Sequence, residues 1–228
     1  GIGDGVKALI VEHERATPGG LVYDWLDSHD IEPVDYRIDV DENDVDPSGY
    51  DLIIPLGSEF AAFDDHISWI PRERKLLRNA VEADVSVLGI CFGGQQLARE
   101  FGGQSFRANT SEIGWLPVRT QDPELVPEGP WFQWHFDTFT APPGATVIAD
   151  SDVGPQAYVM GRNMGVQFHP EVTPTIMDDW VRVYRHELDA EGVDPDQLLE
   201  QTHTRAEENR KTSWRLLDAF LHRVAKLR

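Results

Sequence analysis

The sequence predicts an α/β fold with an open, mostly parallel twisted sheet, helices on both of its faces and a C-terminal helical extension. Two observations predict the sheet. Short apolar runs typical of buried parallel strands recur through the first half of the chain, and stretches with helical apolar spacing separate them. The third observation is their order, because strands that alternate with helices favour a parallel sheet covered on both sides.

The first predicted elements form a βαβ unit. Residues 6–11 are a short apolar run and form the first strand. The apolar residues between positions 19 and 29 recur at helical spacing, and residues 33–38 alternate as a second strand. A strand, a helix and a second strand in this order predict two parallel neighbours in one sheet.

A third and a fourth strand follow in the same pattern. After an acidic stretch at 39–46, typical of a solvated loop, residues 51–54 form the third strand. Residues 71–82 have the spacing of an amphipathic helix, and residues 85–90 are a fourth buried strand. This strand runs directly into residues 91–98, which have the composition of a tight turn that opens a helix.

The second half of the chain reads as β-rich. Short β-like pieces separated by proline and glycine occur between residues 105 and 164, at 115–119, 146–149 and 156–160. Residues 166–168 form a last short strand, and a helix begins at residue 174. The remaining segment, 195–228, is charged and helical in pattern, with apolar residues for one buried face.

The composition indicates which kinds of partner and which compartment to expect. The 228 residues carry 20 Lys and Arg against 40 Asp and Glu, a formal charge of -20 that would repel nucleic acid and anionic lipid. No apolar run approaches the ~20 residues of a membrane span, so we expect neither a nucleic-acid nor a membrane partner. A single cysteine cannot form an intramolecular disulfide and no secretory pattern is present, so we expect a cytoplasmic protein.

Cys91 is the candidate nucleophile. It follows the fourth strand in Gly89-Ile90-Cys91-Phe92-Gly93, the cysteine counterpart of the G-x-S-x-G elbow, where small flanking residues allow a strained turn. The helix that follows brings its positive N-terminal end to the sulfur, which favours the thiolate. A free cysteine is usually an inert buried residue, but the carboxyl end of a parallel strand is where open α/β sheets bind ligands. The position therefore favours catalysis.

His169 and Glu171 are the candidate base and its orienting acid. His169 follows the predicted strand 166–168, which places it at the carboxyl edge of the sheet beside the elbow. Pro170 restricts the turn, so the carboxylate of Glu171 could reach the far imidazole nitrogen and fix the tautomer. No further His, Asp or Cys falls at a ligand spacing around this pair, so we expect no metal, and we expect no cofactor.

Four segments carry the most specific motifs of the chain: Gly-Ile-Cys-Phe-Gly-Gly-Gln at 89–95, Ser-Glu-Ile-Gly-Trp at 111–115, Trp-His-Phe-Asp at 134–137 and Gly-Val-Gln-Phe-His-Pro-Glu at 165–171. Together they resemble the class I glutamine amidotransferases, and among them free-standing proteins similar to the amidotransferase part of GMP synthase. The resemblance runs in order from about residue 9 to residue 184 and implies a flavodoxin-like α/β domain.

The resemblance implies a mechanism for the candidate residues. Cys91 would form a γ-glutamyl thioester with glutamine and release ammonia. His169 would act first as base and then as acid, and Glu171 would orient it. The backbone N–H groups of Gly57 and Phe92 would donate hydrogen bonds to the oxyanion.

The resemblance also implies contacts with the substrate. Gln95 matches the family glutamine that contacts substrate. His135, Phe136 and Asp137 match the loop that helps to hold the α-amino and α-carboxyl groups. The chain departs from the family at one point, because the loop that usually reads Gly-Gly-Pro reads Leu-Gly-Ser at 56–58.

We expect a catalytic domain over residues 1–190 and a helical extension over 191–228 that packs on it or on a partner. The sequence has no Ser-Gly-Gly-rich phosphate loop and no Walker-type run to activate an acceptor. The first hypothesis is therefore a glutaminase whose ammonia passes to a separate synthetase.

Two other functions remain open. A stand-alone γ-glutamyl hydrolase, acting on a γ-glutamyl amide, peptide or conjugate, needs no synthetase. An inactive binding or regulatory module could keep the fold, although the intact Cys, His and Glu set argues against it. For the two enzymes the substrate is a small molecule, glutamine or a γ-glutamyl compound. The oligomeric state is also open, and a homo-oligomer is one possibility, because the C-terminal segment could form a dimer contact.

Overall fold

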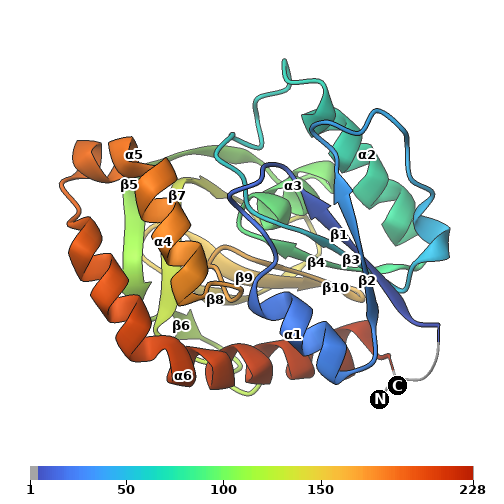
Figure 1. Cartoon of the computed structure of the whole chain (residues 1–228). Coiled ribbons are helices and arrows are strands. Elements are labelled where there is room, and N and C mark those ends of the chain that lie inside the picture. Colours follow the sequence, from blue (N-terminus) through green and yellow to red (C-terminus); the bar gives the residue numbers. More distant parts are fainter. Residues whose placement is uncertain (1–4, 228) are drawn as a thin grey trace.

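The computed structural model describes residues 5–227 and centres on an eight-stranded sheet (Figure 1). The neighbouring strands β2, β1, β3, β4 and β10 run parallel, and β9, β8 and β6 continue the sheet antiparallel. In sheet order the strands are β2 (Glu32–Arg37), β1 (Lys7–Glu12), β3 (Leu52–Pro55), β4 (Ser86–Ile90), β10 (Asn163–Val166), β9 (Pro155–Met160), β8 (Thr146–Asp150) and β6 (Arg119–Thr120). The predicted fold class, an open and mostly parallel sheet, is confirmed.

Helices lie on both faces of this sheet. One face carries α1 (Leu21–Ser28), α6 (Pro195–Ala219) and the π-helical turn η2 (Phe220–Ala225), and the other carries α2 (Trp69–Glu82) and α3 (Phe92–Glu100). The 3-10 turn η1 (Pro47–Gly49) precedes β3. Within residues 5–227, no helix is both long and apolar enough to cross a membrane.

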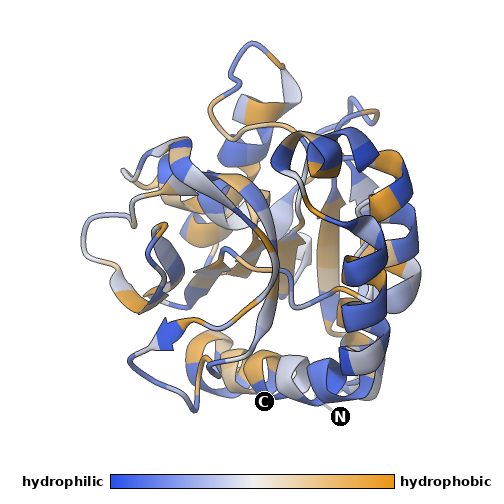
Figure 2. Cartoon of the chain, turned by 90° about the vertical axis from the view of Figure 1, so that its left-hand side faces the viewer, coloured by the Kyte–Doolittle hydropathy of each residue, from blue (hydrophilic) through white to orange (hydrophobic). Residues whose placement is uncertain are grey.

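The alternation of side chains along each strand builds the two cores. In β1, Ala8 and Ile10 join the core under α1 and α6, whereas Leu9 and Val11 join the core under α2 and α3. Both faces are buried, so the strand is apolar throughout instead of alternating. In Figure 2 the central strands are coloured as hydrophobic, and the helices around them carry long polar stretches.

A two-stranded ribbon stands beside the main sheet. It pairs β5 (Ser105–Leu116) with β7 (Trp131–Phe139) in antiparallel register. The helices α4 (Pro174–Val183) and α5 (Arg185–Glu191) lie next to it (Figure 1). Phe132 and Trp134 of β7 and Trp180 of α4 share a third core, so this ribbon and these helices form one wall beside the carboxyl ends of the parallel strands.

Three details of the β-rich half differ from the sequence prediction. The predicted piece 115–119 is wrong, because β5 ends before Pro117, which has no N–H to donate, and β6 begins at Arg119. The predicted last strand 166–168 is also misplaced: β10 ends at Val166, and the chain then leaves the sheet toward His169. Strand β7 was not separately predicted, since its residues are buried on both faces at its start and show no alternation.

The C-terminal helix α6 packs against the protein's own core. Leu216 and Leu217 are fully buried there, and η2 adds Phe220 and Leu221 to the same cluster. The indole Nε1 of Trp25 in α1 also donates a hydrogen bond to the Asp218 carboxylate at 2.9 Å. The division of the chain between residues 190 and 191 stays a prediction, as does any contact of α6 with a second copy or a partner.

Candidate active site

Cys91 lies at the sharp turn between strand β4 and helix α3. Its φ of 52° is in the left-handed region that few residues other than glycine adopt, so the turn is strained. The Cys91 N–H donates to the Val166 carbonyl of β10 at 2.8 Å. Two glycines allow the backbone segments around the turn to pack closely. A Cβ at Gly93 would lie 2.1 Å from the Pro55 oxygen of β3, and one at Gly89 would lie 2.6 Å from the Gly93 oxygen of α3.

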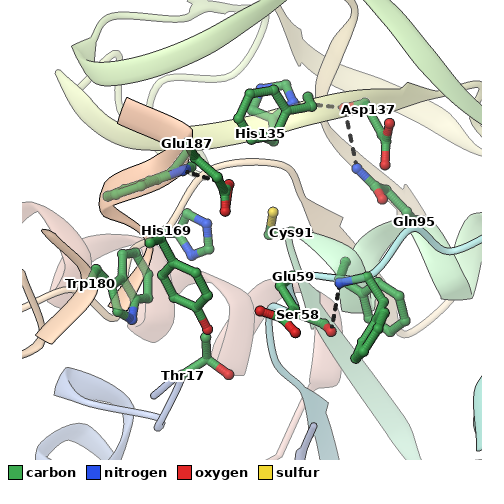
Figure 3. A pocket seen from close by; sticks show the side chains of 15 residues that line it. Thr17, Ser58, Glu59, Cys91, Gln95, His135, Asp137, His169, Trp180 and Glu187 are labelled. Carbon is green, nitrogen blue, oxygen red and sulfur yellow. Dashed lines mark hydrogen bonds between the residues drawn. The ribbon is translucent and has the colours of Figure 1, made fainter. Parts of the chain in front are cut away.

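His169 and Glu171 lie together beside this turn. His169 Nδ1 and Glu171 Oε2 are 2.9 Å apart, and both side chains are buried. Figure 3 shows the imidazole of His169 facing the Cys91 sulfur. Because Nδ1 donates its proton to the carboxylate, Nε2 is the nitrogen left for the thiol. The ring of Trp180 packs edge-on against the imidazole, with centroids 4.9 Å apart, and limits its rotation.

The surroundings of His169 favour its charged form. Burial by itself would lower the pKa, because it disfavours the imidazolium. The carboxylate of Glu171 and the sulfur of Cys91 outweigh burial and hold the pKa of His169 well above its ordinary value. A charged imidazole beside the sulfur stabilises a thiolate, which is the nucleophilic form of cysteine.

Two backbone N–H groups near the Cys91 side chain have no acceptor among residues 5–227. Phe92 is the first residue of α3, so the helix offers its N–H no carbonyl. The N–H of Gly57, in the loop after β3, also donates no hydrogen bond within this part of the chain. Gly57 lies against His169 and Cys91, because a Cβ added there would be 3.0 Å from His169 Cε1 and 3.8 Å from Cys91 Cβ.

An open pocket leads from solvent to Cys91 (Figure 3). Its walls come from the loops after β1 and β3, the start of α3, strand β7 and the helices α4 and α5. It is lined by Thr17, Ser58, Glu59, Phe60, Cys91, Phe92, Gln95, Trp134, His135, Phe136, Asp137, His169, Trp180, Tyr184 and Glu187. These side chains are aromatic, polar or acidic, and none is Lys or Arg, so the pocket favours a ligand that presents neutral or cationic groups to them.

Gln95 reaches this pocket from the first turns of α3. Its Nε2 donates to the Asp137 carbonyl at 3.3 Å and to Gln167 Oε1 at 3.0 Å. Gln167 Nε2 lies 3.5 Å from Cys91 Sγ, so a chain of amides connects the pocket wall with the sulfur. Gln167 was not singled out from the sequence. The signal that could have found it is a glutamine inside an apolar run, two residues before His169.

The segment from His135 to Asp137 lies on β7, across the pocket from the nucleophile (Figure 3). Both ring nitrogens of His135 meet acceptors within the protein, Nε2 at 2.8 Å from Glu112 Oε1 and Nδ1 at 2.7 Å from the Asp137 carbonyl. His135 therefore fixes the shape of this segment. Arg107 lies over the ring of Phe136 at 4.9 Å, and burial raises the pKa of the half-buried Asp137 carboxyl.

The family description "glutamine amidotransferase class-I" matches residues 28–182. The chain belongs to the class I glutamine amidotransferases. The resemblance stated from the four sequence segments is thereby confirmed. The matched region of this amidotransferase contains the nucleophile turn, His169 and Glu171, and it ends within α4, before α5 and α6 begin.

Individual relatives agree with the family. The chain is 37% identical over 127 residues to a glutamine-hydrolysing GMP synthase of Thermus thermophilus, a match that covers 50% of this chain and 25% of that protein. It therefore spans about a quarter of that curated relative. Among solved structures it is similar to a glutamine amidotransferase from Thermotoga maritima, with a TM-score of 0.85, 28% identity and coverage of 98% and 100% of the two chains. A glutamine amidotransferase from Methylobacillus flagellatus also gives a TM-score of 0.85, with 26% identity and coverage of 95% and 94%.

Several walls of the amidotransferase pocket were not indicated by the sequence patterns. Trp180 and Tyr184 follow the predicted helix start at residue 174, and helical periodicity does not tell which part of the protein a helix faces. Glu187 Oε1 accepts a hydrogen bond from Trp134 Nε1 at 3.2 Å, and burial raises the pKa of this glutamate. Burial likewise raises the pKa of Glu59, on the opposite wall. Only tertiary packing brings these two acids to the pocket, so no sequence motif indicates either of them.

Proposed function

We propose that this protein hydrolyses the side-chain amide of glutamine through a γ-glutamyl thioester on Cys91, with a Cys91-His169-Glu171 triad. The observation that carries the proposal is the buried contact of 2.9 Å between His169 and Glu171 beside the strained turn of Cys91. Membership in the class I glutamine amidotransferases supports glutamine as the substrate.

The proposed reaction begins when His169 holds the thiol proton and the Cys91 sulfur attacks the γ-carbonyl carbon. As the C–S bond forms, the carbonyl oxygen becomes an oxyanion that accepts hydrogen bonds from the N–H groups of Gly57 and Phe92. The C–N bond then breaks, the imidazolium protonates the leaving nitrogen, and ammonia departs. In the second half His169 removes a proton from water, the water oxygen attacks the thioester, and glutamate leaves as the thiol is restored.

The residues across the pocket hold the glutamyl part of the substrate in this proposal. Gln95 offers its side-chain amide close to the nucleophile, and the carboxylate of Asp137 suits an α-ammonium group. His135 and Phe136 shape the segment that carries Asp137. Fixing both ends of the substrate places its amide carbon at the sulfur, which contributes to the rate by proximity.

We further propose that the ammonia passes to a separate synthetase, which activates the acceptor. The similarity to proteins named glutamine-hydrolysing GMP synthase supports this use of ammonia. This part of the proposal predicts a low glutaminase rate for the purified protein and a higher rate when the synthetase is present.

A second candidate is a γ-glutamyl hydrolase that releases an amine larger than ammonia. The pocket favours it in one respect: Glu59 and Glu187 lie on its walls, with no Lys or Arg among the lining residues. Carboxylates at these positions would attract the ammonium group of a leaving amine.

The substrate and the thioester are tested together. The purified protein is incubated with glutamine and with a panel of γ-glutamyl amides whose leaving amines are neutral, cationic or anionic, and ammonia, amine and glutamate are followed. Cys91→Ala should lower every turnover by about 10³-fold or more, since the thiol forms the covalent intermediate. Hydroxylamine added to the wild type should trap γ-glutamyl hydroxamate.

The outcomes separate the candidates. Preference for glutamine supports the amidotransferase, and preference for cationic γ-glutamyl amines supports the hydrolase. Turnover that survives Cys91→Ala would disprove the thioester for either. Asp27→Ala, on the exposed side of α1, serves as the control for handling and folding.

A further inference from the structure

The carbonyl oxygen of Gly57 is held by two side chains from the loop after β1. His13 Nδ1 donates to it at 3.0 Å, and Thr17 Oγ1 donates to it at 3.2 Å. A carbonyl oxygen has two lone pairs, so these two donors occupy both of them. Both side chains are buried, and nothing in the reaction described above uses either of them.

The peptide group on the other side of Gly57 is also fixed. The Leu56 carbonyl accepts a hydrogen bond from the Gly93 N–H, in the nucleophile turn, at 3.1 Å. Gly57 has no side chain to restrict its φ and ψ, so these hydrogen bonds set the direction of its own N–H. Two donors hold the peptide after Gly57, and one donor holds the peptide before it.

A buried polar network stands behind His13. Its Nε2 contacts the Glu73 carboxylate of α2, and the other oxygen of Glu73 accepts a hydrogen bond from Gln96 Nε2 of α3 at 2.8 Å. Gln96 Nε2 also donates to the Ile70 carbonyl at 2.9 Å. The His13, Glu73 and Gln96 side chains are essentially inaccessible to solvent. The ring of His13 stacks on Trp69, with centroids 5.0 Å apart, which fixes its plane.

The hydrogen bonds of His13 require both of its ring nitrogens to be donors, because the Gly57 carbonyl and the Glu73 carboxylate only accept. Burial disfavours a charged imidazole, but Glu73 and the Gly57 carbonyl outweigh burial and raise the pKa of His13. A buried ion pair adds little stability over apolar packing, because desolvation offsets the attraction between the charges. Stability alone is thus a weak reason for this pair.

We propose that His13 and Thr17 are positioning residues of the oxyanion hole. They hold the Gly57 carbonyl, so that the Gly57 N–H stays aimed at the oxygen that develops charge. Glu73 and Gln96 act through His13 by keeping it doubly protonated and in place. Donors fixed in advance lower the barrier because they need no reorganisation during the reaction. The inference rests on the proposed attack of Cys91 on a γ-glutamyl carbonyl.

Glu73→Gln is the main test, since this residue touches neither the pocket nor the reacting atoms. The new amide keeps the length of the side chain but removes its charge, so His13 becomes neutral, and the hydrogen bond that it donates to the Gly57 carbonyl loses the charge assistance that roughly doubles the strength of such a bond. We expect kcat to fall about 10-fold, less than the 10²–10³-fold of losing an oxyanion donor outright, with KM nearly unchanged. Alkylation of Cys91 by iodoacetamide should keep its rate, because that displacement forms no oxyanion.

Thr17 offers a second and smaller substitution. Thr17→Val keeps the shape of the side chain and removes the donor, so it should lower kcat several-fold and leave the alkylation rate of Cys91 unchanged. Thr17→Ser keeps the hydroxyl and should keep most of kcat. Thr212→Val is the matched control, because Thr212 is a buried threonine of α6 that donates to the Glu208 carbonyl. It should leave kcat unaltered.

NMR gives a readout that does not depend on turnover. Both ring nitrogens of His13 should carry protons in the wild type and one in Glu73→Gln, and the Gly57 amide should become mobile in that variant. The inference is overturned if folded Glu73→Gln keeps full kcat, if the Gly57 amide stays equally ordered, or if kcat and alkylation fall together. If the wild type cleaves no γ-glutamyl amide, the proposed function itself has failed, which is a different result from an active wild type with an unaffected variant.

Discussion

Cys91 and the pair formed by His169 and Glu171 lie side by side but are held in different ways. The main chain of Cys91 is fixed by its left-handed φ, by two glycines and by two hydrogen bonds, one from its N–H to the Val166 carbonyl of β10 and one from the Gln95 N–H to its own carbonyl. His169 and Glu171 lie in a segment with no regular secondary structure, between β10 and α4. Because such a segment forms no regular backbone hydrogen bonds within itself, its buried carbonyls need donors from other parts of the protein.

Residues distant in sequence satisfy those carbonyls. The Leu21 N–H at the start of α1 donates to the Glu171 carbonyl at 2.9 Å. From α6, Ser213 Oγ donates to the Pro170 carbonyl at 2.8 Å, and Asn209 Nδ2 donates to the Val172 carbonyl at 3.3 Å. Figure 1 shows α1 and α6 side by side on this face of the sheet. Cys91 thus lies in one contiguous strand–turn–helix motif that packs against β3 and β10, whereas the His169–Glu171 turn has no regular structure of its own and is held by α1 and α6.

This difference explains what could be predicted from the sequence. Gly89 and Gly93 lie within two residues of Cys91 in the sequence, so the turn, its strand and its helix could be recognised as one motif. The fold class was visible for the same reason, because periodicity is local. The contacts of Ser213 and Asn209 were not visible, since neither position has any pattern that connects it to Pro170 or Val172. The role of Gln167 and the acids of the pocket could not be predicted for the same reason, because contacts between residues distant in sequence leave no local pattern.

The largest effect is expected from Glu171→Gln, which removes the charge behind His169 and leaves the nucleophile turn intact. A neutral amide can present its NH₂ group to the imidazole and select the wrong tautomer, so kcat/KM should fall about 10³-fold. Alkylation of Cys91 by iodoacetamide at neutral pH should also slow, because less imidazolium stabilises the thiolate. Full activity in a folded Glu171→Gln would contradict the assignment of this residue.

The same variant changes the pKa of His169 in a defined direction. The charge of Glu171 is the largest single influence that raises this pKa, so Glu171→Gln should lower the pKa of His169 in an NMR titration. A raised pKa in the folded protein stabilises it below about pH 6.5, the unfolded value, and this stabilisation disappears as the pH rises through the folded value. The loss of stability in Glu171→Gln should therefore be greatest at low pH and shrink as the pH rises. An unchanged pKa of His169 in Glu171→Gln would contradict this role of Glu171.

A matched pair of glycines compares the two regions directly. A Cβ at Gly93 would lie 2.1 Å from the Pro55 oxygen in the nucleophile region, and one at Gly20 would lie 2.2 Å from the Glu171 oxygen in the acid–base region. Each clash is with backbone, so we expect Gly93→Ala and Gly20→Ala each to lower the free energy of unfolding by ~1–3 kcal/mol, and a displacement of about 1 Å to lower kcat by about 10²-fold. Gly49→Ala is the control, because a Cβ there meets nothing within 4 Å.

The two glycine variants should differ in the reactivity of the thiol. Gly93→Ala distorts the turn that carries the sulfur, so alkylation of Cys91 should change along with kcat. Gly20→Ala moves the Glu171 segment, so kcat should fall while the backbone at Cys91 keeps its conformation. If both variants changed the amide signals around Cys91 alike, the two regions would be one mechanical unit and the distinction would be wrong.

The smallest effect, and the sharpest test of α6, is expected from Ser213→Ala. The substitution removes one hydrogen bond and leaves the Pro170 carbonyl unsatisfied in a buried place, which should cost ~1–3 kcal/mol of stability and lower Tm by a few degrees. Because Pro170 lies between His169 and Glu171, kcat should fall a few-fold with KM retained. Glu207→Ala on the exposed face of the same helix is the control and should change neither quantity. An unchanged kcat in Ser213→Ala, with the expected loss of stability, would mean that α6 supports the fold without positioning the acid–base turn.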